Sequence, residues 1–261
     1  MQPIKSAQNP SFQKMLGLAK TPKARQEAQL FLVEGPHLAA EAMQHGLAQQ
    51  VWASQEALGS AEGSKLSQAA AKAKVPVGEM AASLLDRLCD TRQPQGWVTV
   101  VRRPIIKGAE QTLWLALDSI QDPGNLGTLL RCAWACKAGV LVGPGSADAW
   151  APKVLRSAAG AHFAIPIQES SDLASSLKAL KAQGFKLAAA DPRGDLRHTA
   201  GSWAGPTVFV LGAEGAGLSA EALSVCDFKV KIDYPGGAES LNAAISGALL
   251  LFEALRQRSK T

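Results

Sequence analysis

The chain has 261 residues, of which 47% are hydrophobic and 19% are charged, a composition typical of a globular protein with a sizeable core. No apolar run is long enough to cross a membrane and the N-terminus lacks the apolar segment of a signal peptide, so we expect a cytoplasmic protein with no membrane partner. The formal net charge of +5 lies entirely in residues 1–107, with 13 Lys and Arg against 8 Asp and Glu, and a basic module of this kind is typical of proteins that bind nucleic acid.

The first hundred residues predict a small α/β domain. Its apolar patterns indicate four short strands and four helices, with a basic loop after the first helix. The helices are expected at about 10–20, 36–46, 60–74 and 81–89, and the strands at 30–33, 51–53, 75–77 and 97–101. Residues 91–107 are rich in arginine and proline, a change of composition that marks the end of the domain. We therefore place the first domain at 1–104 and a linker at 105–112.

Residues 113–261 alternate between apolar strands and helices. The strands are expected at 113–118, 139–142, 163–167, 185–190, 207–211 and 229–233, and the helices at about 125–137, 151–159, 171–182, 219–224 and 240–257. The strands are continuous apolar runs, as in sheets that are buried on both faces. This alternation predicts the α/β class, with a mostly parallel sheet covered by helices on both sides.

Two strand-to-helix corners of this second domain carry polar residues. The first reads DPGNLGTLLR, in which Asn125 is positioned to cap the helix and Arg131 follows on its first turns. The second reads LGAEGAGLS, whose glycines let the backbone approach a ligand closely and whose Glu214 is expected to pair with an arginine. Each segment is also compatible with a plain structural turn.

A third corner follows the last strand, where a Pro-Gly-Gly turn leads into a helix and Ser240 is expected as its N-cap. The carboxyl ends of parallel strands lie at one edge of a sheet, so we expect all three corners to form one site. Other kinds of site are disfavoured. Cys132 and Cys136 have no further ligands with metal spacing, so no metal is expected. The second corner is not GxGxxG and has no P-loop lysine, which argues against a nicotinamide-linked enzyme.

Together, DPGNLGTLLR, LGAEGAGLS and IDYPGGAESLNAAISGALLLFEALRQR resemble the three motifs of the SpoU (TrmH-like) RNA 2′-O-ribose methyltransferases of the SPOUT superfamily. Residues 153–161 resemble the segment between the first two motifs. The N-terminal SAQNP, LAKTPKAR and FLVEG resemble a substrate-binding domain, related to RNA-binding ribosomal proteins, that many members carry. The resemblance implies a trefoil knot, S-adenosyl-L-methionine as the cofactor, a homodimer, and structured RNA as the substrate, with ribosomal RNA favoured over transfer RNA.

The resemblance also assigns roles to residues. The family's polar active-site positions match Asn125, Arg131, Glu214, Ser240 and Asn242. Its cofactor-binding positions match Leu211, Gly212, Gly217, Ile232, Ser240 and Leu241. The basic candidates for RNA contact are Lys23, Arg25, Arg92, Arg102 and Arg103. One departure is Ala213, where the family often has Asn, and it bears on the subfamily rather than on the activity.

The resemblance implies that Arg131 acts as the base in methyl transfer. Because guanidinium stays protonated and is a poor base, the alternative is that Arg131 grips a phosphate and hydrogen-bonds the 2′-oxygen as charge develops. Glu214 is expected to fix that arginine, while Ser240 and Asn242 orient the ribose or the cofactor. The competing hypothesis is a non-catalytic RNA-binding or ribosome-assembly factor of the same fold. Cofactor binding discriminates between the two, because a binding module need not take the cofactor up.

Overall fold

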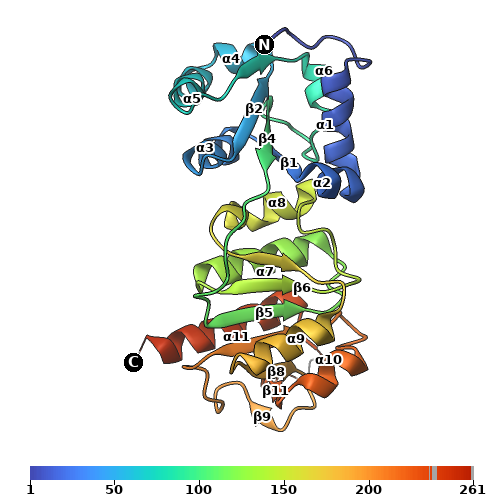
Figure 1. The fold of residues 1–261 in the computed structure, drawn as a ribbon, viewed down its shortest axis with the longest axis vertical. Coiled ribbons are helices and arrows are strands. Elements are labelled where there is room, and N and C mark those ends of the chain that lie inside the picture. The colour runs from blue at the N-terminus through green and yellow to red at the C-terminus, as the bar shows by residue number, and fades with distance from the viewer. Residues whose placement is uncertain (235, 237–239, 260–261) are drawn as a thin grey trace. The chain divides into compact units, whose positions relative to one another are not determined.

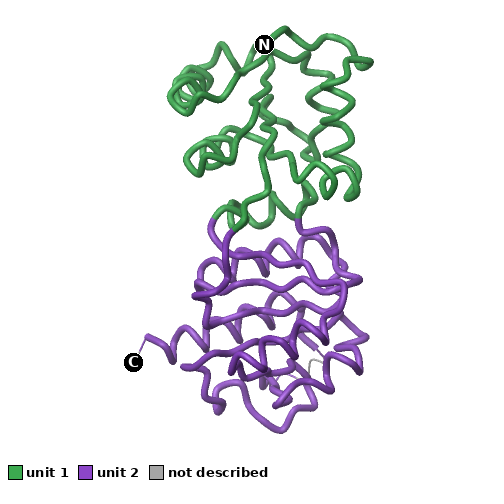
Figure 2. Tube along the Cα trace, in the orientation of Figure 1, with its two compact units in different colours: residues 1–105, 150–163 green, residues 106–149, 164–261 purple. Residues whose placement is uncertain are grey.

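The computed structural model describes residues 1–234, 236 and 240–259, which form two compact units. Unit 1 comprises Met1–Ile105 and Trp150–Phe163, and unit 2 comprises Ile106–Ala149 and Ala164–Thr261 (Figure 2). The linker predicted at 105–112 therefore straddles the division, and most of it belongs to unit 2. In the described part of the chain, no helix is both long and apolar enough to cross a membrane.

Unit 1 is built on a four-stranded mixed sheet (Figure 1). Its elements are α1 (Pro10–Lys20), α2 (Pro22–Ala28), β1 (Leu30–Glu34), α3 (Pro36–Gln44), β2 (Ala48–Ala53), α4 (Gln55–Gly59), α5 (Ala61–Lys72), β3 (Val77–Glu79), α6 (Ala82–Leu85), β4 (Trp97–Arg102), α8 (Pro152–Ala158) and the 3-10 helix η1 (Ala161–Phe163). The strand order is β1-β4-β2-β3, with β4 antiparallel to both neighbours and β3 parallel to β2. One core cluster includes Phe12, Trp52 and Leu85, so α1 and the segment around α6 close over the same side of the sheet.

Two short helices in unit 1 differ from the prediction. α2 occupies the segment expected to be a basic loop, and α4 was not predicted. Pro22 suits the first turn of α2, where the missing N–H is not needed. The side chain of Arg25 is buried and its Nη1 donates to the carbonyls of Leu18 (2.6 Å) and Ala19 (3.3 Å) at the end of α1. The basic segment is thus folded back on α1 by an internal arginine.

The segment 150–163 packs with unit 1, although it lies within the sequence range of the predicted second domain. Its aromatic side chains pack on strand β1. The ring of Phe31 lies 5.2 Å from that of Trp150 and 6.3 Å from that of Phe163, measured between centroids. Burial of these aromatic surfaces holds the segment to unit 1 although its sequence neighbours belong to unit 2.

Unit 2 is a parallel sheet covered by helices on both faces (Figure 1). Its elements are β5 (Leu113–Leu117), α7 (Pro123–Ala135), β6 (Gly139–Val142), β7 (Ile167–Glu169), α9 (Leu173–Ala182), β8 (Lys186–Ala190), β9 (Leu196–Arg197), β10 (Thr207–Leu211), α10 (Ala220–Val225), β11 (Phe228–Lys231) and α11 (Ala243–Arg258). The seven strands lie in the order β7-β6-β5-β10-β8-β11-β9, and every pair is parallel. The predicted α/β class is confirmed. The short strand β9 was not predicted, and the trefoil knot stays a prediction.

The two faces of this sheet bury alternate side chains of the same strands. Trp114 and Ala116 belong to a core cluster that includes residues of α9 and α10. On the other face α7 and α11 pack together. There, a Cβ added at Gly247 of α11 would meet the side chains of Leu129, Leu211 and Leu115, so glycine is needed for the close approach of α11 to α7 and the sheet. This packing fixes the N-terminal ends of both helices beside the carboxyl edge of the sheet.

The helix caps at this edge differ from those predicted. Asp122, and not Asn125, caps α7, since its Oδ1 accepts the N–H of Asn125 (2.8 Å). Asn242, and not Ser240, caps α11, since its Oδ1 accepts the N–H of Ala244 (2.9 Å) and of Ile245. Helix α11 therefore begins at Ala243, three residues later than predicted. Because Asp122 caps α7, the side chain of Asn125 is free for other contacts.

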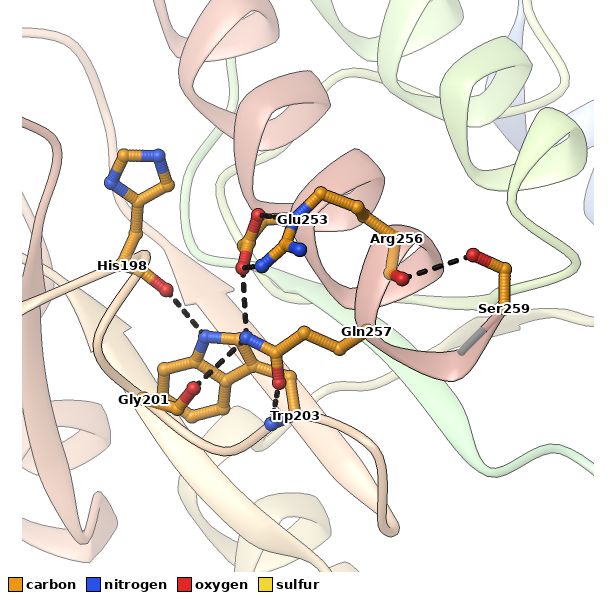
Figure 3. Close-up of polar contacts among 7 residues, drawn as sticks. All are labelled: His198, Gly201, Trp203, Glu253, Arg256, Gln257 and Ser259. Carbon is orange, nitrogen blue, oxygen red and sulfur yellow. Dashed lines mark hydrogen bonds and ion pairs between the residues drawn. The ribbon is translucent and has the colours of Figure 1, made fainter. Parts of the chain in front are cut away.

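The C-terminal end of α11 is anchored by a polar network around Glu253 (Figure 3). Arg256 donates to both carboxylate oxygens of Glu253, at 2.7 and 2.8 Å. The amide of Gln257 donates to Glu253 Oε1 (2.8 Å) and to the carbonyl of Gly201 (2.9 Å), and its own oxygen accepts the N–H of Trp203 (2.8 Å). The network ties the loop 198–203 to the helix whose other end forms the polar corner.

We expect this network to stabilise unit 2 in a pH-dependent way. The bonds from Arg256 lower the pKa of the Glu253 carboxyl from 4.5 to about 2. A lowered folded-state pKa contributes stability above pH 4.5 that is lost as the pH falls toward 2. Glu253→Gln should therefore lower the free energy of unfolding at pH 7 by about 2 kcal/mol, allowing for the half-exposed arginine. Denaturant unfolding at pH 7 and pH 3 should show this difference shrinking in acid, and a difference that stays constant would contradict it.

Candidate functional site

The carboxyl edge of the unit 2 sheet carries a hydrogen-bonded cluster with one residue from each of the three corners. Asn125 donates its Nδ2 to Oε1 of Glu214 (2.9 Å). Asn242 donates its Nδ2 to the same oxygen (2.9 Å) and to Oδ1 of Asn125 (3.0 Å). The three corners, which are up to 117 residues apart in sequence, thus meet at one point.

Glu214 is the centre of this cluster, and its contacts correct the predicted pairing with an arginine. Its Oε1 also accepts the backbone N–H of Ala243 at the start of α11 (3.1 Å). Three N–H groups therefore converge on one oxygen of Glu214. Glu214 holds the glycine-rich loop to the first turns of α7 and α11, and its partners are amides rather than a guanidinium.

A cavity of about 600 Å³ opens beside the cluster. Its volume lies within the range of about 300–1,000 Å³ that is usual for small-molecule sites. The cavity is lined by every residue predicted to bind the cofactor: Leu211, Gly212, Gly217, Ile232, Ser240 and Leu241. Glu214 and Asn242 also line it, so the polar cluster forms part of its wall.

The glycine-rich loop forms one side of this cavity as a tight turn. The backbones of Ala213 and Gly217 exchange two hydrogen bonds, at 3.1 and 2.9 Å. A Cβ added at Gly212 would overlap the carbonyl of Gly217 and the N–H of Leu218, both backbone groups. The loop can close in this way only with glycine at 212, which leaves backbone groups facing the cavity.

One charged residue of the cavity was missed by the sequence reasoning. Asp191 follows the end of β8, lines the cavity and is buried. Burial opposes its ionisation, but hydrogen bonds from the side chain and backbone of Arg193 hold its pKa below the ordinary value. The sequence could have identified Asp191 by its position directly after a buried strand, the feature that identified the three predicted corners. With Glu214 it gives the cavity wall two carboxylates, and no Lys or Arg is among the described lining residues.

S-adenosylmethionine, the cofactor implied by the resemblance, fits this lining. Apolar side chains of Leu211, Val230 and Ile232 suit an adenine ring, and the exposed backbone of the glycine-rich loop offers hydrogen bonds to it. The carboxylate of Glu214 suits a cation, because opposite charges attract strongly where water is partly excluded, whereas the charge of Asp191 is already balanced by Arg193. No group of three or more potential metal ligands occurs within the described residues.

Arg131 lies on α7 but outside the cluster. It is six residues after Asn125, which on an α-helix turns the two side chains about 120° apart. Its side chain is exposed, does not line the cavity, and makes no hydrogen bond or ion pair with the described residues. The structure therefore brings together Asn125, Glu214 and Asn242, with Ser240 at the cavity, and leaves Arg131 on an outward face of its helix.

The basic residues predicted to contact RNA all belong to unit 1 and differ in exposure. Arg92 and Arg102 are exposed. Lys23 is exposed and lies 3.8 Å from Glu27, while the guanidinium of Arg103 stacks over the ring of Trp150 at 4.7 Å. Arg25 is the correction in this set. Its guanidinium is buried against carbonyls of α1, so it serves the fold and we exclude it from the RNA-contact candidates.

Comparison with known proteins assigns each part of the chain to a family model. The model of the SpoU rRNA Methylase family matches residues 112–252. The model of the MRM3-like substrate binding domain matches residues 9–99. The first match contains all three corners, and the second contains most of unit 1.

Relatives of known activity match over nearly the whole chain. The 23S rRNA (guanosine(2553)-2'-O)-methyltransferase RlmP of Bacillus subtilis is 31% identical, over 97% of this chain and 98% of the relative. The 23S rRNA (uridine(2479)-2'-O)-methyltransferase of Streptomyces viridochromogenes is 31% identical, over 97% of this chain and 92% of the relative. Among solved structures, the SpoU methyltransferase AviRb from Streptomyces viridochromogenes in complex with AdoMet has a TM-score of 0.86 and 30% identity, covering 97% of this chain and 99% of that one.

Proposed function

Since the chain belongs to the SpoU rRNA methylase family, we propose that it transfers a methyl group from S-adenosylmethionine to a ribose 2′-hydroxyl of ribosomal RNA. The observation that carries this proposal is the cluster of Asn125, Glu214 and Asn242 in the wall of the cavity. A non-catalytic RNA-binding factor would need neither the cavity nor this polar set, and the relatives cited above are themselves methyltransferases. Ribosomal RNA as the substrate also favours the cytoplasmic location predicted from the sequence.

Binding and alignment are the main tasks of this chain in the reaction. Bound S-adenosylmethionine supplies a methyl group that is already activated by its positive sulfur. The chain's own residues then have to orient the acceptor hydroxyl for in-line attack. The glycine-rich loop and Leu241 would hold the cofactor, Glu214 would complement its positive charge, and Ser240 would contact it or the ribose.

The acceptor hydroxyl loses its proton during transfer, so the developing negative charge on its oxygen needs a cation. Arg131 remains the candidate, gripping the neighbouring phosphate and donating to the 2′-oxygen. In its own subunit the residue faces away from the cluster by about 120°. We therefore assign Arg131 to the site of a partner subunit, which requires a homodimer.

An exposed apolar stripe supports such a dimer. Ile245, Leu249 and Phe252 follow one another at helical spacing along α11, with 53%, 40% and 49% of their surfaces exposed. Trp134 on the packed neighbour α7 is 39% exposed and lies one turn after Arg131. An apolar face of this size on adjoining helices is typical of a subunit interface. Arg131, three residues before Trp134 on α7, would then lie near the edge of the surface that a second copy covers.

We expect Phe252→Asp to break this dimer. A charge placed within an apolar interface is left without a partner, so dimer affinity should fall by at least about 100-fold. Sedimentation velocity at micromolar protein should show a shift from dimer to monomer. Phe228→Asp is the matched control, because Phe228 is 39% exposed on β11 and outside the stripe. Equal behaviour of the two variants would contradict the assignment of the interface.

The proposed function is tested by mapping 2′-O-methyl groups in ribosomal RNA from cells with and without the protein. The purified chain should restore the missing methyl group on unmodified 23S transcript, and only when S-adenosylmethionine is present. Methylation of transfer RNA but not ribosomal RNA would overturn the choice of substrate. Cofactor binding without methylation of any RNA would overturn the activity.

A further inference from the structure

A second cavity, of about 220 Å³, lies at the same edge of unit 2. The segment 119–122, between β5 and α7, forms much of its lining. It shares Ala213, Glu214 and Ala243 with the larger cavity, and Asn125 also lines it. Of the polar cluster, Glu214 lines both cavities, Asn242 the larger one and Asn125 the smaller one. The two cavities therefore adjoin at Ala213, Glu214 and Ala243, so that molecules bound in them would lie next to each other.

The segment 119–122 is held rigidly. Ser119 has a positive φ of 60°, which is uncommon for a residue with a side chain. Ile120 is buried, and both of its backbone groups are bonded: its N–H donates to Ser146 Oγ (3.0 Å) and its carbonyl accepts from Ala147 (2.9 Å). Asp122 is fixed as the cap of α7. A backbone constrained at Ser119, Ile120 and Asp122, on both sides of Gln121, presents Gln121 in a defined place.

Gln121 is the free polar group of this cavity. It lines the cavity, its side chain is exposed, and it makes no hydrogen bond with the described residues. A primary amide carries two N–H donors and one acceptor, a combination that matches the edges of nucleobases. Proteins that read single nucleotides in RNA do so by hydrogen bonds to such edges.

The charges of the cavity favour a base over a phosphate. Its described lining includes the carboxylates of Asp122 and Glu214 and neither Lys nor Arg. Phosphate would be repelled by these groups, whereas a neutral base and a ribose would not. The small volume suits one nucleoside rather than a length of RNA.

We propose that this second cavity takes the nucleoside whose 2′-hydroxyl is methylated, and that Gln121 hydrogen-bonds the edge of its base. The inference rests on the proposed function, since it presumes an RNA acceptor. In this proposal Gln121 is a specificity-determining residue that contributes to the choice of nucleotide. Glu214, which lines both cavities, lies near the reacting hydroxyl.

The test uses unmodified 23S transcript in which the nucleotide methylated by the wild-type protein has first been mapped. Gln121→Ala should raise KM for this RNA about tenfold and leave kcat within about twofold, because a contact made equally in ground and transition states affects binding alone. Its preference for the native base over the other three at the mapped position should shrink. Gln121→Glu, which only accepts hydrogen bonds, should change the order of preference. Gln183→Ala, at an exposed glutamine after α9, is the matched control.

Calorimetry with S-adenosylmethionine separates this role from a structural one. We expect the Gln121→Ala protein to bind the cofactor as the wild type does. Weakened cofactor binding, or an unchanged KM together with unchanged base preference, would overturn the inference and leave the proposed function standing. A wild-type protein that methylates no ribosomal RNA would instead overturn the proposed function, and the inference with it.

Discussion

Replacing Gly212 with alanine should reduce the affinity for S-adenosylmethionine by about 100-fold or more. The added methyl group would overlap the backbone of Gly217 and Leu218, which cannot move aside as a side chain could. The glycine-rich loop must then open, and a displacement of about 1 Å at a binding loop costs about 100-fold. Titration calorimetry with the purified variant measures the loss directly, and methylation of RNA should fall with it.

Gly205→Ala is the control for this substitution. Gly205 lies in the same unit, its φ is not positive, and no atom lies within 4 Å of the Cβ that would be added. It should bind the cofactor normally. The melting temperature of the Gly205→Ala protein should stay close to that of the wild type, whereas that of the Gly212→Ala protein should fall because the contacts of Glu214 on the same loop are disturbed. If the Gly212→Ala protein binds S-adenosylmethionine with wild-type affinity, the loop does not form the cofactor site.

The helices and strands of this fold were largely predictable because the pattern of apolar and polar residues along the chain determines them. Apolar strands buried on both faces and amphipathic helices are local signals, and the comparisons confirm the α/β class, the family and the cofactor class that the motifs indicated. Helix α2 and the segment 150–163 were not predictable in the same way. Arg25 looks like any surface cation until its carbonyl partners are known. The aromatic contacts of Phe31 join residues more than a hundred positions apart.

The candidate site could be predicted as a set of residues but not as a geometry. The rule that parallel strands share a carboxyl edge brought Asn125, Glu214 and Asn242 to one region, where hydrogen bonds now join them. The same rule could not say which residue caps each helix. Asp122 and Asn125 are both suitable caps for α7, and Ser240 and Asn242 are both suitable caps for α11. It also could not orient Arg131. Which face of α7 turns outward depends on how α11 packs on it.

Substituting Arg131 should stop methyl transfer while leaving cofactor binding intact. Alanine removes both the charge and the forked donors, and we expect kcat to fall by about 1,000-fold, the scale of loss when a group that stabilises developing negative charge is removed. Lysine keeps the charge without the bidentate geometry and should recover only part of the loss, to within about 10- to 100-fold of the wild type. Single-turnover methylation measures both. Near-normal activity of Arg131→Lys would show that bidentate geometry is unimportant.

Mixed dimers decide which subunit Arg131 serves. One subunit carries Arg131→Ala and the other Gly212→Ala, each with its own purification tag, so that only the mixed species is recovered. If Arg131 reaches across the interface, the cavity of the first subunit keeps its own Gly212 and receives the intact arginine of the second. Up to half of the wild-type activity should then return, although each homodimer is inactive. If Arg131 acts within its own subunit, every site in the mixed dimer lacks one of the two residues, and no activity returns.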